Sequence, residues 1–459
     1  MPKPDQACQA THDMAQYISQ ALQMPLPLPV EEKTTLHVLD TLAATISGSV
    51  LPGGQAGTRA AHRLGGPAES LAIGAQLLVG APQAAMANAM AAHADETDDS
   101  HVGGRFHPGC AVVPAALAMA ECYGRSGPEF LRAVALGYDI GARAVMALGV
   151  KSADTARYST HSIGANFGAT AAATALAGLD AEGARYALSY AVQQTSGVPY
   201  WRRDKDHIEK AFDFGGMGAR NGVLAALMVA EGFSAVDGVL TGAPSFLSAF
   251  AQNPRPKALC DALGERYEIM EAAIKKWCVG SPIQAALDAL TTLMARHNLT
   301  PDMVARITAI MPDDRLHIVD NRDMPDVCLQ HLLAITLLDD GLSFAAAHDH
   351  ERMKSAAVLD LRKRIFAIGN KELSDALPPR QAIIEIETIQ GETLRHHTRA
   401  VLGTPANPMS RAQVAQKAHD LMHHILGELG TQALINATLN LASLTDMRAL
   451  RPLLLARQL

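Results

Sequence analysis

Apolar residues recur at helical spacing through most of the first 260 positions of the chain. Within residues 29–48, Leu36, Leu39, Leu42 and Ile46 fall close to one face of a helix, and a shorter helix is expected before it, from about residue 12. The same periodicity predicts helices over residues 110–123, 127–148 and 163–177, separated by glycine, proline and short polar turns. This part of the chain is therefore predicted to be entirely helical.

The pattern changes near Gly264 and changes back after Pro408. Strands are predicted at residues 267–274, 304–311, 382–389 and 392–401, the last two joined by a turn at Gln390-Gly391. Helices are predicted between them, at residues 282–297, 328–339 and 347–368. We therefore predict a mainly α protein, in which a large all-helical domain (residues 1–264 and 406–459) encloses a smaller α+β domain (residues 265–405) in the sequence.

Composition narrows the class of protein. Of the 459 residues 48% are hydrophobic and 19% charged, which is typical of a globular chain with a large core, and the net charge of -7 argues against nucleic-acid and membrane partners. The six cysteines are scattered without metal-type spacing, which favours reduced thiols. Neither a signal peptide nor a membrane span is evident, so we expect a cytoplasmic protein.

The candidate chemistry gathers in residues 93–101, directly after a run of alanine, methionine and other small residues at 79–92. If that helix continues, His93, Thr97 and His101 extend the face begun by Met86 and Met90, with Glu96 and Ser100 on the next face. Buried charges are costly unless they are paired, so such a helix end is expected to open into a cleft. The alternative interpretation is a solvated helix end followed by a polar loop.

Two other kinds of site are compatible with this acidic stretch. His93, Asp95, Asp98, Asp99 and His101 could hold a divalent metal ion, which would make the protein a metal-dependent hydrolase. The acidic run could also belong to a terpene synthase. However, no second metal-binding motif is found, and 4% aromatic residues supply an aromatic pocket poorly.

The order His93-Ala94, Asp98-Asp99-Ser100, His107-Pro108 and a following apolar helix resembles the MmgE/PrpD family. Residues 37–48, 129–140, 160–169 and 210–226 resemble further segments of this family. The family includes 2-methylcitrate dehydratases, cis-aconitate decarboxylase and iminodisuccinate epimerase. The resemblance therefore extends over much of the chain.

This resemblance implies a cofactor-independent lyase that removes a proton next to a carboxylate of a small di- or tricarboxylic acid. Dehydration or decarboxylation would follow; epimerisation of a dicarboxylate such as iminodisuccinate is the alternative, and a binding protein without activity is a further one. It also implies a homodimer and an active site between the two domains. The implied catalytic residues are His107, His161, Lys210 and Glu96, and the implied substrate-binding residues are Ser100, His101, Asp99, Lys275 and Lys276. No metal or cofactor is expected.

Some positions depart from the family pattern. Glu96 stands where many members carry aspartate, and Cys278 replaces a proline. Gly280 or Ser281 replaces a histidine, and Val319 stands where the decarboxylase uses a tyrosine. The resemblance therefore defines the fold more closely than the substrate.

Overall fold

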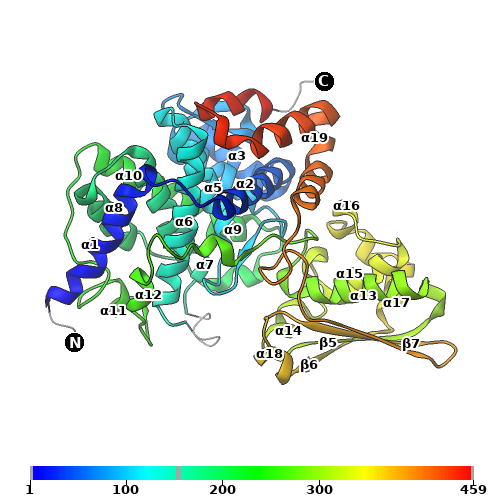
Figure 1. Ribbon diagram of the computed structural model, residues 1–459. Coiled ribbons are helices and arrows are strands. Elements are labelled where there is room, and N and C mark those ends of the chain that lie inside the picture. The colour runs from blue at the N-terminus through cyan, green and yellow to red at the C-terminus, as the bar shows by residue number, and fades with distance from the viewer. Residues whose placement is uncertain (1–3, 151–156, 456–459) are drawn as a thin grey trace. The chain divides into compact units, whose positions relative to one another are not determined.

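The computed structural model describes residues 4–150 and 157–455 (Figure 1). Its contacts divide the chain into two compact units, one formed by Met1–Ala272 with Ser410–Leu459 and the other by Ala273–Met409. The first unit is helical, whereas the second combines helices with a four-stranded sheet. The chain is thus mainly α with a smaller α+β part, which confirms the predicted fold class.

Helices build almost all of the first unit. In chain order they are α1 (Pro4–Gln20), α2 (Leu28–Gly48), α3 (Pro52–Leu64), α4 (Ala81–Ala92), α5 (Pro108–Tyr123), α6 (Gly127–Ala147), α7 (Thr160–Ala177), α8 (Ala181–Gln193), α9 (Ile208–Ala211), α10 (Met217–Ala230), α11 (Phe246–Phe250), α12 (Lys257–Cys260) and α19 (Arg411–Leu439). The short strands β1 (Ser70–Ala72) and β2 (Leu77–Val79) pair antiparallel before α4, and β3 (Ser100–His101) precedes α5. The helices predicted between residues 29 and 177 are confirmed to within a few residues at each end.

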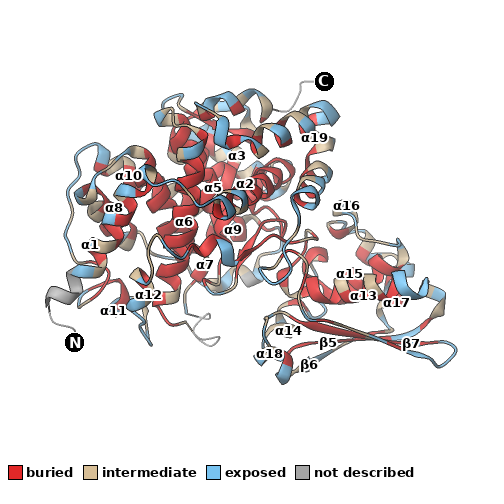
Figure 2. Ribbon diagram, in the orientation of Figure 1, coloured by how far each residue is buried: buried red, intermediate tan, exposed pale blue. Residues whose placement is uncertain are grey.

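The centre of the first unit depends on small side chains. Helices α5, α6 and α7 are buried along most of their length (Figure 2). A β-carbon on Gly168 of α7 would lie 2.6 Å from the carbonyl oxygen of Gly137 on α6, and one on Gly141 would lie 2.6 Å from that of Gly164. Glycines four residues apart on each helix therefore allow the two backbones to touch.

Replacing Gly168 by alanine is expected to destabilise the protein. Alanine is the better helix former by about 1 kcal/mol, but overpacking against a rigid backbone oxygen costs about 1–3 kcal/mol, so the clash outweighs the gain in propensity. Gly430→Ala is the control, because its nearest neighbour is a side-chain atom at 3.3 Å. Thermal melts should show a clearly lower melting temperature for Gly168→Ala and not for Gly430→Ala. Equal melting temperatures of the two variants would contradict this close contact.

The second unit packs helices against one mixed sheet with strand order β6-β5-β7-β8. Its strands are β5 (Val304–Pro312), β6 (Ile365–Asn370), β7 (Ala382–Thr388) and β8 (Thr393–Thr398). Its helices are α13 (Gln284–His297), α14 (Asp313–Val319), α15 (Leu329–Leu338), α16 (Phe344–Ala347), α17 (Ala356–Arg362) and α18 (Lys371–Asp375). Strand β5 pairs parallel with β6 and antiparallel with β7, which pairs antiparallel with β8.

Two predictions in this region are wrong. The helix predicted over residues 347–368 is broken into short helices and the strand β6, because Ile365, Phe366 and Ile368 favour a strand and this segment pairs with β5. The strand predicted at residues 267–274 is a 3-10 turn (Glu268–Glu271) followed by the two-residue strand β4 (Ala272–Ala273). In that turn the Glu268 carboxylate forms an ion pair with Arg266 and lies 3.3 Å from His101 Nε2, so side-chain contacts and not strand pairing hold it.

The C-terminal helix α19 packs on α2 within the first unit (Figure 1). Lys417 of α19 donates from Nζ to Asp40 Oδ1 at 2.6 Å and to the carbonyl oxygen of Thr97 at 3.0 Å. Burial outweighs the Lys417 ammonium and raises the pKa of Asp40 to about 6. Asp40 is therefore a structural carboxylate, and Lys417 connects the end of the chain to the segment that carries the candidate chemistry.

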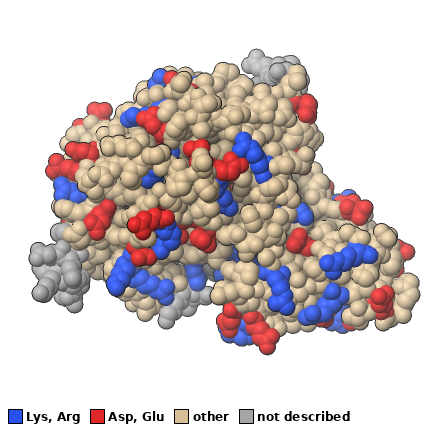
Figure 3. Space-filling model, viewed as in Figure 1, with Lys and Arg blue, Asp and Glu red and all other residues tan. Residues whose placement is uncertain are grey.

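Acidic and basic side chains are interspersed on the face of the molecule in view (Figure 3). None of the helices in residues 4–150 and 157–455 combines the length and apolar character needed to cross a membrane.

Candidate active site

The segment after α4 does not continue the helix. Helix α4 ends at Ala92, and Asp95 then closes a tight turn by accepting hydrogen bonds from the Thr97 backbone nitrogen at 2.7 Å and its Oγ1 at 2.8 Å. Aspartate and threonine compete with helical hydrogen bonding through such local contacts. The predicted helical face shared by His93, Thr97 and His101 is therefore wrong.

All residues from Asp95 to His101 are buried, and His93 is fully enclosed. The alternative of a solvated helix end is thus contradicted. Buried ionisable groups need partners, and the following contacts show which groups supply them.

Asp98 holds two imidazoles at once. Its Oδ1 lies 2.9 Å from His93 Nδ1 and 3.2 Å from His107 Nδ1. Burial alone would raise the pKa of Asp98, but the two histidines hold it well below its usual range. Because an ionised carboxylate only accepts, both histidines donate from Nδ1, and a neutral ring then presents a lone pair at Nε2.

Asp99, by contrast, is engaged on both oxygens. His37 Nδ1 and the Tyr138 hydroxyl lie 2.6 Å from Oδ2, and the Gly109 backbone nitrogen donates to Oδ1 at 2.9 Å. Gly109 is in the first turn of α5, so Asp99 also satisfies a free N–H at the start of this helix. These contacts give Asp99 a structural role, and its predicted role in substrate binding stays a prediction.

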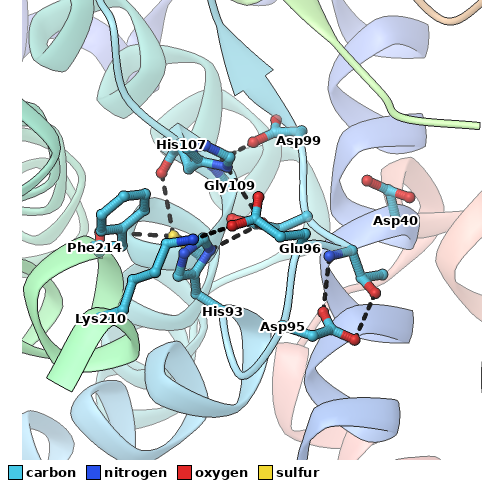
Figure 4. A network of polar contacts seen from close by, with 12 residues as sticks. Asp40, His93, Asp95, Glu96, Asp99, His107, Gly109, Lys210 and Phe214 are labelled. Atoms are coloured by element: carbon cyan, nitrogen blue, oxygen red, sulfur yellow. Dashed lines mark hydrogen bonds and ion pairs between the residues drawn. The ribbon is translucent and has the colours of Figure 1, made fainter. Parts of the chain in front are cut away.

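Lys210 and Glu96 form a buried ion pair (Figure 4). Lys210 comes from the one-turn helix α9, which runs directly into a π-helical turn at Phe212–Gly216. Such a turn adds one residue to a helix and is frequent at functional sites. It places the Phe214 ring 5.2 Å from Lys210 Nζ and 5.4 Å from the His107 ring.

His161 lies on the same phenyl ring. It stacks on Phe214 at a centroid distance of 3.6 Å and is 5.5 Å from the His107 ring. Ser159 begins α7 by accepting a hydrogen bond from the Ser162 backbone nitrogen, which sets the position of His161 in the first turn. Burial, with the nearby histidines and Lys210, holds the pKa of His161 well below its usual range, so the ring is neutral near pH 7.

The four predicted catalytic residues therefore meet in one place, whereas the predicted substrate-binding residues do not all join them. His101 Nε2 donates to the carbonyl oxygen of Glu268 at 3.1 Å, and its Nδ1 accepts from the Gly104 backbone nitrogen at 2.8 Å. These two hydrogen bonds fix His101 in its loop, and its predicted role in substrate binding stays a prediction. Ser100 is buried in β3.

Lys275 and Lys276 belong to the second unit. Lys275 is buried there, and the Lys276 ammonium lies 4.1 Å above the Trp277 ring and 4.0 Å from Asp288 Oδ1. Their predicted role in substrate binding stays a prediction.

The predicted set of metal ligands does not converge, because Asp95, Asp99 and His101 point to other partners. Among the described residues, two other groups bring three potential ligand atoms within 4.8 Å of one another: His93, Asp98 and Cys110, and His93, Glu96 and His207. Cys110 Sγ is 3.2 Å from the His107 carbonyl oxygen and 3.6 Å from that of Phe214.

Sequence reasoning missed several members of this cluster. Phe214 and the π-helical turn give no periodic signal, and His207 belongs to no motif that the sequence analysis identified. The role of Asp98 as the partner of two histidines was also missed. The only sequence signal for this role is that His93 lies five residues before Asp98 and His107 nine residues after it. This spacing brings the three side chains together only in the folded loop.

Asp213 in the π-helical turn is another buried carboxyl group, and it accepts a hydrogen bond from Ser159 Oγ at 2.5 Å. Burial raises its pKa to about 7, so the folded protein binds this proton more tightly than the unfolded chain. The stability that this proton contributes is present at low pH and is lost as the pH rises from about 4 to 7.

Asp213→Asn, which cannot ionise, is expected to melt at a higher temperature than the parent at pH 8. A shift of roughly three pKa units corresponds to at most about 4 kcal/mol, and the difference should shrink toward pH 5. Calorimetry at both pH values tests this, with the exposed Asp420→Asn as control. A difference that does not depend on pH would show that Asp213 is not ionised in the folded protein at pH 8.

The fold and the cluster together define a class of protein. It is a mainly helical protein in which imidazoles, carboxylates and the ammonium group of Lys210 are buried together near the end of helix α4, which is rich in small residues. Family models agree with this class. The MmgE/PrpD N-terminal domain matches residues 12–259, and the MmgE/PrpD C-terminal domain matches residues 277–442. The chain belongs to the MmgE/PrpD family.

Among characterised relatives, the chain is 23% identical over 485 residues to a protein named cis-aconitate decarboxylase from Aspergillus terreus. The alignment covers 97% of this chain and 95% of the relative. A sequence with the same name from A. terreus strain NIH 2624 / FGSC A1156 shows the same identity and coverage.

Proposed function

We propose that this protein is a cofactor-independent lyase that removes a proton next to a carboxylate of a small di- or tricarboxylic acid. Family membership and the full-length similarity to proteins named cis-aconitate decarboxylase support an enzyme of carboxylic acids. The observation that carries the proposal is the cluster itself, in which His107, His161 and Lys210 surround one phenyl ring.

The proposed base is His107. Asp98 accepts the Nδ1 proton of His107, so the Nε2 lone pair of the neutral ring is available for a proton on carbon. The negative charge of Asp98 then stabilises the imidazolium that forms. His107 is also the residue that precedes helix α5, and its side chain does not cap that helix. The His107 ring therefore belongs to the cluster and not to the helix cap.

Lys210 is proposed to hold the carboxylate beside the reacting carbon. When the proton leaves, negative charge spreads from carbon onto this carboxylate, and an ammonium group fixed in a dry site stabilises it strongly. Glu96 pairs with Lys210 in the structure. We propose that a substrate carboxylate competes for this ammonium group and that Glu96 then orients a histidine or supplies a proton.

The alternatives differ in what leaves the reacting carbon. In a dehydratase, the carbon loses a proton to the base, and the hydroxyl group on the neighbouring carbon leaves and takes a proton to form water. In a decarboxylase, CO₂ leaves in place of the proton, its bonding electrons stay on the carbon, and the carbon then receives a proton from the enzyme. In an epimerase, the carbon loses a proton and receives one back on the opposite face. His161 is neutral near pH 7 and can exchange a proton in any of these steps.

An NMR screen in D₂O tests the proposal, with citrate, 2-methylcitrate, cis-aconitate, malate derivatives and iminodisuccinate as substrates. Loss of a C–H signal with formation of an alkene supports a dehydratase, and formation of a decarboxylated acid supports a decarboxylase. Exchange without net loss of substrate supports an epimerase.

Lys210→Ala should raise the KM or remove activity in this screen, since it removes the positive charge that binds the carboxylate. If no acid shows exchange or turnover with the parent protein, a protein without lyase or epimerase activity is favoured. Activity that appears only with added metal ions would favour the metal-dependent hydrolase.

A further inference from the structure

His207 has an unusual backbone for its position. It precedes α9 in the left-handed region, with φ of 61° and ψ of 13°, where residues other than glycine are uncommon. Its side chain is 5% exposed, and among the described residues its Nε2 has no hydrogen-bond partner. A strained residue that buries an unpartnered imidazole nitrogen is expected to serve a ligand, because the protein itself does not satisfy that atom.

The His207 ring faces His93 at a centroid distance of 5.2 Å. His93 is fully buried, and its Nε2 also has no hydrogen-bond partner among the described residues. Asp98 fixes the His93 ring by accepting from Nδ1 at 2.9 Å. A carboxylate behind a histidine is the arrangement that orients metal-binding imidazoles in proteins, because it leaves the Nε2 lone pair for the ion.

From this geometry we infer that His93, His207 and Glu96 form a binding site for one divalent transition cation of the Zn²⁺ class. One ligand atom from each of the three residues lies within 4.8 Å of the others. Ligand atoms around zinc at about 2.0–2.1 Å stand roughly 3.3 Å apart, so the three side chains would close by up to about 1.5 Å on binding. Two imidazoles, a carboxylate and one open position suit zinc better than calcium or magnesium, which prefer oxygen.

The ammonium group of Lys210 competes with this cation for Glu96, because the two side chains form an ion pair. The enclosed carboxylates of Glu96 and Asp98 carry two negative charges against the one positive charge of Lys210. A cation can therefore bind by displacing Lys210 from Glu96. A bound cation would hold the Glu96 carboxylate, which the proposed lyase needs to orient a histidine or supply a proton. Zinc should therefore inhibit the proposed lyase, and a chelator should restore activity.

The other group, His93 with Asp98 and Cys110, is less suited to an ion. Asp98 Oδ1 already accepts from two histidines, and Cys110 Sγ contacts two backbone carbonyl oxygens. The group of His93, Glu96 and His207 contains two imidazole nitrogens without a hydrogen-bond partner among the described residues, so the cation site is assigned to this group.

Zinc titration of chelator-treated, full-length protein by calorimetry tests the inference without a substrate. His419 and His423 must be removed first, because they lie one turn apart on α19 and could bind zinc at the surface. In this background we expect one zinc ion per chain. Co²⁺ in place of Zn²⁺ should give the visible absorption of a four-coordinate site.

Two variants test the assigned ligands. His207→Asn should weaken zinc binding by roughly 10²-fold or more, and asparagine tolerates the left-handed backbone, so the variant should fold. Lys210→Met should strengthen binding by at least about tenfold, because it removes the competing positive charge.

Equal zinc affinity in the parent and in His207→Asn would overturn the inference, as would loss of all binding when the surface pair is removed. Stabilisation by citrate but not by zinc, abolished in His207→Asn, would also overturn it and show that His207 serves an anion. Because binding is measured without turnover, these results are independent of the outcome of the NMR screen.

Discussion

His107→Ala is expected to abolish turnover while leaving the fold and its melting temperature nearly unchanged. Loss of a general base typically costs about 10²–10⁴ in rate. The carboxylate of Asp98, which accepts from His107, keeps His93 as a partner when the His107 ring is removed. Steady-state kinetics on the acid identified by the D₂O screen measures the effect.

The surface variant His419→Ala is the control for this experiment, since its ring pairs with the exposed carboxylate of Glu428. It should retain full activity. A His107→Ala variant with a rate within tenfold of the parent would contradict the assignment of His107 as base. Restored activity on addition of free imidazole would support it, because the small base would enter the space left by the side chain.

Asp99→Ala is expected to have the largest effect on stability. The change leaves His37 Nδ1, the Tyr138 hydroxyl and the Gly109 backbone nitrogen buried without an acceptor. Each unsatisfied buried donor costs about 1–3 kcal/mol, so a loss of roughly 3 kcal/mol or more in the free energy of unfolding is expected. Denaturant titration followed by circular dichroism measures it.

Tyr138→Phe is the matched control for Asp99→Ala. It removes one of the three donors and leaves Asp99 with the other two, so the expected cost is only about 1 kcal/mol. Equal losses in the two variants would show that the Asp99 carboxylate is not the centre of this network.

The regular parts of the fold could be predicted because their hydrophobic periodicity agrees with the tertiary structure. Helices α2, α5, α6 and α7 and the strands β5, β7 and β8 are of this kind. Strand β6 was missed because only two residues separate it from helix α17, which ends at Arg362, and the apolar residues of both segments were assigned to one helix. It lies at the edge of the sheet, where half-exposed Phe366 and Ile368 leave no clear alternation.

The cluster was predicted only in part, for a different physical reason. His107, His161, Lys210 and Glu96 were assigned through their resemblance to family motifs, and the structure brings these four together. The contacts of Asp98 depend on how the loop after α4 turns, and the position of His207 depends on a left-handed backbone that histidine rarely adopts. No pattern of residue types encodes either feature.

The hydrogen bonds made by Lys417 affect the order in which the parts of the protein fold during synthesis. Lys417 follows its acceptor Thr97 by 320 residues, and at about 5–20 residues per second the ribosome needs tens of seconds to synthesise the intervening chain. During that time Asp40 is without the ammonium group that compensates its burial. The continuous segment 273–409 can fold while synthesis proceeds, whereas the helical unit is completed only when the last helix emerges. A truncation before α19 should therefore leave a nascent chain whose second unit is folded and whose segment after α4, residues 93–101, is not.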